Sequence, residues 1–170
     1  MTDTPAPSTQ ADGASVTDAA TSPVASPAAS PAAVRPPNRI IASWRREQEF
    51  ATSKPGGPVA IVDGHGITGM GPVDTLLSAL ATCASADVVE ILKKRRTPVT
   101  SLEVEVVGRR VDATPRRLEH VLLRFRIAGA GIERDQAERA IELSITKYCS
   151  VRDSLDPAIP VEWELDLQSS

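Results

Sequence analysis

The residues from 72 to about 94 constrain the fold more than any other part of the chain, because they predict one long helix that is apolar on nearly every side. Apolar residues recur there every three or four positions, at Val73, Leu76, Leu77, Leu80, Ala84, Val88 and Ile91. Pro72 suits the first turn of a helix, and the basic residues 93–96 followed by Pro98 suit its end. A helix of this kind needs neighbours on several sides, so we expect it at the centre of the domain.

Shorter segments on both sides of this helix predict strands. The expected strands are residues 39–52, 59–62, 102–106, 118–127 and 161–167, and a second helix is expected over residues 132–147. The segments 102–106 and 118–127 alternate apolar with polar residues, which is typical of an antiparallel pair with one face in water. The whole order predicts an α+β fold in which antiparallel sheets surround the long central helix.

The first 38 residues have a different composition from the rest of the chain. They hold seven of the 14 prolines and ten alanines, and they contain no aromatic residue, leucine or isoleucine. Such a segment buries too little apolar surface to offset the entropy lost on ordering. We therefore predict a disordered tail over residues 1–38 and one folded domain over residues 39–170.

The charge and the distribution of apolar residues argue against several classes of partner and location. From residue 39 onward there are 18 basic and 19 acidic residues, a balance that argues against a nucleic-acid partner. No uninterrupted apolar run approaches the roughly 18–20 residues of a membrane span, so no membrane partner is expected. The first residues have neither the basic nor the apolar region of a secretory signal, and we expect a cytoplasmic protein.

The two cysteines, Cys83 and Cys149, are the strongest candidates for reactive residues. They are 66 positions apart and far in sequence from His65 and His120, so they form no zinc-ligand pattern, and we expect no metal and no cofactor. Neither a P-loop nor a dinucleotide-binding or serine-hydrolase motif occurs. In a reducing compartment, two such cysteines are either inert core residues or a redox pair.

Two segments of the chain resemble the OsmC/Ohr family (osmotically inducible and organic hydroperoxide resistance proteins). The first is Gly-Pro-Val-Asp-Thr-Leu-Leu-Ser-Ala-Leu-Ala-Thr-Cys at residues 71–83, and the second is Lys-Tyr-Cys-Ser-Val at residues 147–151. The order of strands and helices over residues 39–168 is also similar to that of the family. The resemblance implies an OsmC-like fold assembled as an intertwined homodimer.

The same resemblance implies a peroxiredoxin-like hydroperoxide reductase that serves in oxidative-stress defence. Cys83 would attack an organic hydroperoxide, or hydrogen peroxide, and become a sulfenic acid. Cys149 would resolve that acid to a disulfide, and a dithiol reductant would restore both thiols. In the family, an arginine from an early strand and a glutamate before the cysteine orient the site; Arg45 or Arg46 and Asp74 stand in the matching positions here.

Helix and strand geometry add three expectations to this assignment. Nine residues separate Asp74 from Cys83, which places them on opposite faces and about 13 Å apart along an unbroken helix. The carboxylate that the periodicity places beside Cys83 is Asp87, four residues later. Arg45 and Arg46 are neighbours on a strand, so we expect them to point to opposite faces and at most one to face the site.

A second function remains open at this point. A non-catalytic OsmC-like domain could bind a small apolar ligand in the dimer groove, with both cysteines retained as core residues. The two functions differ in the reactivity of Cys83, which is high in the peroxidase and low in the binding protein.

Overall fold

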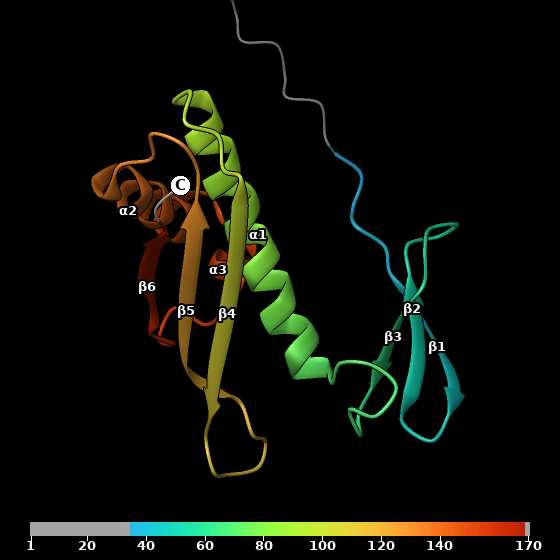
Figure 1. Ribbon diagram of the computed structural model, residues 1–170. Helices are drawn as coiled ribbons and strands as arrows, with labels where there is room; N and C mark the ends of the chain where they lie inside the picture. Colours follow the sequence, from blue (N-terminus) through green and yellow to red (C-terminus); the bar gives the residue numbers. More distant parts are fainter. Residues whose placement is uncertain (1–34, 169–170) are drawn as a thin grey trace, which may run out of the picture. The chain divides into compact units, whose positions relative to one another are not determined.

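The computed structural model describes residues 35–168 (Figure 1). The predicted tail, residues 1–38, lies almost entirely outside the described residues. The elements are β1 (Ile41–Arg46), β2 (Glu49–Ser53), β3 (Ala60–Asp63), α1 (Pro72–Lys94), β4 (Ser101–Arg110), β5 (Leu118–Ala128), α2 (Arg134–Leu143), the π-helical segment η1 (Ser144–Tyr148), α3 (Ser150–Asp153) and β6 (Val161–Gln168). They form two three-stranded sheets and a set of helices, which confirms the predicted α+β class.

The first sheet contains three strands where the sequence predicts two. The segment expected as one strand over residues 39–52 turns back at Glu47 and forms β1 and β2, which pair in antiparallel fashion. Glu47 has a φ of 42°, in the left-handed region that glycine and asparagine adopt most often. This hairpin contains no glycine or proline at its turn, which is why the composition did not reveal it.

Helix α1 spans Pro72–Lys94 as the periodicity predicts. Its side chains at Leu80, Ala84, Val88 and Leu92 are completely buried in the core. By length and composition alone this helix could cross a membrane, a test that the core helix of a soluble protein also passes. These four residues recur every fourth position, so they form the side of α1 that packs into the core.

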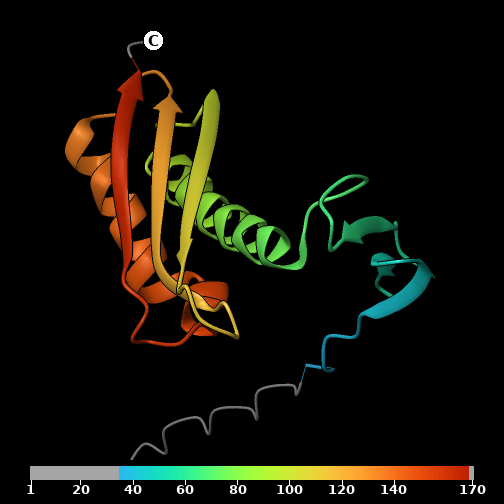
Figure 2. The same ribbon diagram turned by 90° about the horizontal axis from the view of Figure 1, so that it is seen from below.

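The second sheet supports the helices from one side. β4 and β5 pair in antiparallel fashion as predicted, and β6 joins β5 in parallel, so the sheet is mixed. Figure 2 shows α1 and α2 on the same face of this sheet. The buried side chains on that face of β5 are Leu118, Val121, Leu123, Phe125 and Ile127.

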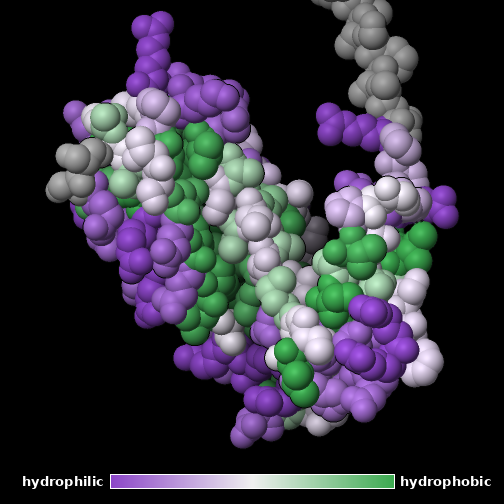
Figure 3. Space-filling model, turned by 45° about the vertical axis from the view of Figure 1, so that its right-hand side comes forward, coloured by the Kyte–Doolittle hydropathy of each residue, from purple (hydrophilic) through white to green (hydrophobic). Residues whose placement is uncertain are grey.

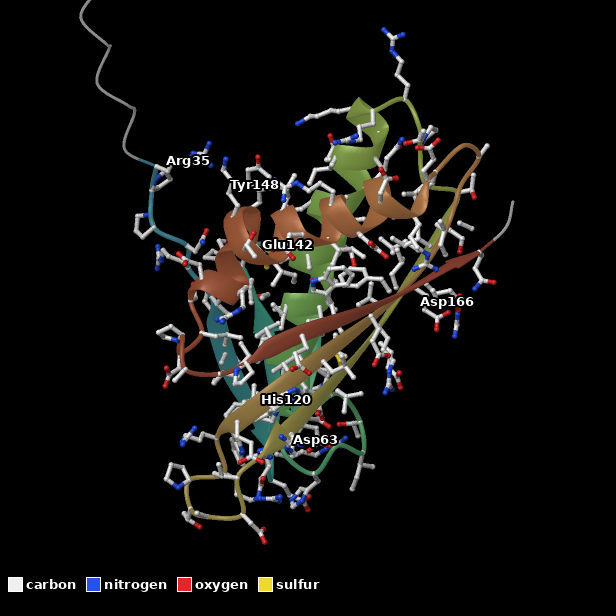
Figure 4. All side chains as sticks on the ribbon, turned by 90° about the vertical axis from the view of Figure 1, so that its left-hand side faces the viewer. Arg35, Asp63, His120, Glu142, Tyr148 and Asp166 are labelled. Atoms are coloured by element: carbon white, nitrogen blue, oxygen red, sulfur yellow. The ribbon has the colours of Figure 1, made fainter. Side chains whose placement is uncertain are left out.

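The opposite face of the second sheet is covered by charged rows. Each row places an arginine of β5 between an acid of β4 and an acid of β6, as Glu105–Arg124–Glu164 and Glu103–Arg126–Asp166. His120 pairs with Glu162 at 3.0 Å on the same sheet, and Figure 4 shows His120 and Asp166 on neighbouring strands. The polar residues of the alternating pattern therefore form a solvated face, as the sequence predicts.

The second predicted helix differs from its expected form. α2 ends at Leu143, and the chain continues as the π-helical segment η1 before it reaches Cys149. A π turn contains one residue more than an α turn and is frequent at functional sites. Apolar periodicity does not distinguish the two, so the sequence predicted one continuous helix over residues 132–147.

Candidate functional site

The fold brings the two cysteines together although 66 positions separate them in the sequence. Cys83 lies in the middle of α1 and is half-buried. Cys149 lies between η1 and α3, is only 3% exposed and belongs to the same hydrophobic core. Both cysteines are free thiols, and they interact through their side chains. The structure therefore assembles the pair that the sequence motifs singled out.

The surroundings of Cys83 favour its thiolate. Burial disfavours the charge and is the largest single influence, but the backbone N–H of Val151, the Cys149 thiol and the Ser150 hydroxyl all hydrogen-bond to it. Together these bonds outweigh burial and the nearby charge of Asp87, so the pKa of Cys83 lies below its ordinary value. A lowered pKa is what a nucleophilic cysteine needs at neutral pH.

Cys149 has the opposite character. The pKa of Cys149 is raised to about 11, mainly by burial and in addition by its interactions with Cys83. The backbone N–H of Arg152 donates to Cys149 Sγ at 3.4 Å and offsets only part of this effect. Of the two thiols, Cys83 is thus the one that loses its proton first, and Cys149, with a pKa of about 11, keeps its proton at neutral pH.

Asp87 lies beside Cys83, as the helical spacing predicts, and its charge acts on the thiol. The hydroxyl of Ser144, a completely buried residue of η1, lies 3.2 Å from Asp87 Oδ2 and 3.2 Å from the carbonyl oxygen of Ala84. Through these contacts Ser144 links the segment that carries Cys149 to the turn of α1 that follows Cys83. The sequence analysis missed Ser144, because a lone serine in an amphipathic helix carries no distinctive signal.

Asp74 caps the N-terminal end of α1. Its carboxylate accepts a hydrogen bond from the backbone N–H of Gly71 at 3.1 Å, which caps the first turn of the helix. The helix between Asp74 and Cys83 is unbroken, so about 13 Å of axis separates them, as expected.

Arg45 and Arg46 both pair with Glu49. The Arg45 and Arg46 guanidinium groups lie 3.4 Å and 3.0 Å from the two carboxylate oxygens. The expectation that these arginines point to opposite faces does not hold, because a bulge between Trp44 and Arg46 interrupts the alternation. The groups that hydrogen-bond to Cys83 come instead from residues 149–151.

Glu49 belongs to a buried acidic cluster that the sequence analysis missed. The Thr68 hydroxyl lies 2.7 Å from Glu49 Oε2 and 3.1 Å from Asp63 Oδ2. The backbone N–H groups of Thr68 and His65 are the main cause that lowers the pKa of Asp63, to about 2. Asp63 thereby holds the backbone of the loop over residues 64–71, which contains four glycines and precedes α1. The Asp-Gly sequence at residues 63–64 was the available signal for this turn.

A cavity of about 740 Å³ opens beside Cys149. Its lining includes Lys147, Tyr148 and Arg152 as well as apolar residues of the 145–161 segment. Figure 4 shows Tyr148 at the end of the helical run that leads to Cys149. The volume lies within the usual range for small-molecule sites.

Comparison with known proteins places the chain in a family. The family model described as OsmC-like protein matches residues 64–164. Protein YhfA of Escherichia coli (strain K12) is 32% identical over 119 residues, which cover 69% of this chain and 89% of YhfA.

Solved structures share the fold at lower identity. An OsmC-like protein from Mycoplasma pneumoniae matches with a TM-score of 0.69 and 18% identity, over 79% of this chain and 99% of that protein. The organic hydroperoxide resistance protein OhrB of Bacillus subtilis matches with a TM-score of 0.54 and 14% identity, over 76% of this chain and 98% of OhrB. These findings agree with the two cysteine motifs and their meeting in the structure: the chain belongs to the OsmC-like protein family.

Proposed function

We propose that this protein is a thiol-dependent peroxidase that reduces organic hydroperoxides in defence against oxidative stress. Cys83 is the peroxidatic cysteine and Cys149 is the resolving cysteine. The observation that carries this proposal is the direct interaction of two free thiols with opposite pKa shifts, lowered at Cys83 and raised at Cys149.

The reaction follows from these two thiols. The Cys83 thiolate attacks the terminal oxygen of the hydroperoxide, the O–O bond breaks, and the products are a Cys83 sulfenic acid and an alcohol. Cys149 then attacks the Cys83 sulfur, which forms a disulfide and releases water. A dithiol reductant takes up the oxidising equivalents by thiol–disulfide exchange and restores both thiols.

The relatives support organic hydroperoxides as the substrate class. OhrB of Bacillus subtilis is described as an organic hydroperoxide resistance protein, and a Legionella pneumophila structure with a TM-score of 0.57 is described in the same words. Two free cysteines also fit the cytoplasm, which we propose as the location, because thiols there are kept reduced.

We further propose that the protein acts as a homodimer. Within the single chain, only 22% of the most apolar stretch of α1 is buried. Every residue of β1 is exposed, including Ile41 and Trp44, and Figure 3 shows apolar side chains on the surface of the β1–β3 sheet. Apolar surface of this extent is typical of a face that a second subunit covers.

Peroxide consumption tests the proposed function. Wild-type protein, Cys83→Ser and Cys149→Ser are supplied with cumene hydroperoxide and dithiothreitol as the dithiol. The proposal predicts multiple turnovers in the wild type and none above background in Cys83→Ser. If wild type and Cys83→Ser consume peroxide equally slowly, the peroxidase is excluded and the binding of a small apolar ligand becomes the function to test.

A further inference from the structure

The Cys149 thiol lies next to Cys83 before the peroxide reacts, and not only when the disulfide forms. Cys149 is almost fully buried at the junction of η1 and α3, in the hydrophobic core against which Cys83 packs. The Ser144 hydroxyl of η1 lies 3.2 Å from the carbonyl oxygen of Ala84, the residue after Cys83, and the two thiols interact with each other. The reaction described above uses this group only after the sulfenic acid has formed. In the first step it is a proton-bearing group at the reacting sulfur.

The first step needs a proton donor. When a thiolate attacks an alkyl hydroperoxide, the O–O bond breaks and the leaving oxygen becomes an alkoxide, which is a strong base. Proton transfer to that oxygen as the bond breaks lowers the barrier, and a positioned general acid typically contributes 10²- to 10⁴-fold in rate.

The groups around Cys83 differ in their capacity to give up a proton. The backbone N–H of Val151 can donate a hydrogen bond, but it does not release its proton. Asp87 acts on Cys83 as a negative charge, so it is an acceptor. The Ser150 hydroxyl also hydrogen-bonds to Cys83, but an alcohol is a far weaker acid than a thiol. Among these neighbours, Cys149 is the group suited to proton transfer.

We propose that Cys149 is the general acid of the first step, an inference that rests on the peroxidase reaction proposed above. The Cys83 thiolate bonds to the terminal OH oxygen of the hydroperoxide, and the O–O bond breaks. The leaving alkoxide takes the proton of the Cys149 thiol. The products are the Cys83 sulfenic acid, a neutral alcohol and a Cys149 thiolate; sulfur is oxidised by two electrons and the peroxide is reduced by two.

This proton transfer also prepares the second step. Disulfide formation requires a thiolate, yet burial raises the pKa of Cys149 to about 11, so at neutral pH it is rarely ionised by solvent. The alkoxide deprotonates it at the moment when the sulfenic acid appears beside it. The hydroxide displaced from the Cys83 sulfur is neutralised by a solvent proton, equivalent to the one that Cys83 released when it ionised, and water is the product. The two steps are thus linked through the proton that passes from Cys149 to the alkoxide.

The choice of leaving group tests this role. An alkyl hydroperoxide such as tert-butyl hydroperoxide loses an alkoxide, whereas peracetic acid loses a carboxylate that needs no proton. Single-turnover rates for loss of the Cys83 thiol are measured with both oxidants, for wild type, Cys149→Ala and Cys149→Ser. Ser150→Ala is the matched control, because it also removes a side-chain hydrogen bond to Cys83 but leaves the thiol acid in place.

The inference predicts a selective loss. Each rate is compared with the wild-type rate for the same oxidant. By this measure Cys149→Ala should lose about 100-fold more with tert-butyl hydroperoxide than with peracetic acid. Cys149→Ser should show a loss in the same direction. Ser150→Ala should change both rates by the same factor, because it alters only the nucleophile. In each variant, the rate with peracetic acid shows that the protein is folded and that Cys83 is still reactive.

Two other results would overturn the inference, and they are distinguishable from each other. If Cys149→Ala changes both rates by the same factor, Cys149 is a hydrogen-bond donor and resolving residue but not the acid, and the peroxidase stands. If wild-type Cys83 reacts with tert-butyl hydroperoxide no faster than a free thiol, the peroxidase itself fails and the inference falls with it.

Discussion

The substitution Ser144→Ala tests whether the contact between η1 and α1 holds the two cysteines in place. The Ser144 hydroxyl has a single hydrogen and lies 3.2 Å from both Asp87 Oδ2 and the Ala84 carbonyl oxygen, in a residue with no exposed surface. Alanine removes this bond between the segment that carries Cys149 and the helix that carries Cys83.

The cost follows from the chemistry of the bond. A hydrogen bond to a charged group contributes about 1.5–3 kcal/mol, and a neutral one about 1 kcal/mol. Ser144 is fully buried, so no water replaces its hydroxyl, but Asp87 is half-buried and water can satisfy part of its carboxylate. We therefore expect Ser144→Ala to lower the free energy of unfolding by about 1–2 kcal/mol. The rate of disulfide formation between Cys83 and Cys149 should fall as well.

Urea unfolding at one fixed protein concentration measures this loss. Thr146→Ala is the matched control: its hydroxyl lies on the same segment and donates to the Glu142 carbonyl oxygen at 2.7 Å, but it is exposed. Its loss should cost less than about 0.5 kcal/mol. In the Asp87→Asn background, Ser144→Ala should cost less than it does in the wild type. Equal losses for Ser144→Ala and Thr146→Ala would refute this reasoning.

Three further predictions concern charge and assembly. Asp87→Asn removes an anion that raises the pKa of Cys83, so the pH midpoint for alkylation of Cys83 by iodoacetamide should move to lower pH; a move to higher pH would contradict the account. The native pKa of Asp63 is lowered from 3.8 to about 2, so its contribution to stability is complete above about pH 4 and is lost as the pH falls through about 2. Asp63→Asn should therefore lower Tm at pH 7 more than at pH 2, and an equal loss at both pH values would show that the charge is unimportant. The proposed homodimer predicts that the unfolding midpoint falls when the protein is diluted, and a midpoint independent of concentration would count against it.

Local periodicity was sufficient to predict the central helix and one of its contacts. The spacing of apolar residues identified α1 from Pro72 to Lys94, and the same geometry placed Asp87 beside Cys83. Alternation along β4 and β5 likewise identified the antiparallel pair and its charged outer face. These features depend on residues close in sequence or on a simple repeat.

The rest depended on backbone conformations and long-range contacts that have no repeating signal. The turn at Glu47 adopts a left-handed conformation without glycine, so one predicted strand is in fact two. The π turn that begins at Ser144 lies within a normal amphipathic pattern. Glu49 is buried because Arg45, Arg46 and Thr68 surround its carboxylate, and these residues meet only when the first sheet has formed.

The most direct test of the central claim is the product of one equivalent of cumene hydroperoxide, identified by intact mass and non-reducing peptide mapping. The account predicts a Cys83–Cys149 disulfide in the wild type, a trappable sulfenic acid on Cys83 in Cys149→Ser, and no oxidation in Cys83→Ser. Two free thiols in the wild type after this treatment, or a sulfenic acid on Cys149 in Cys83→Ser, would contradict it.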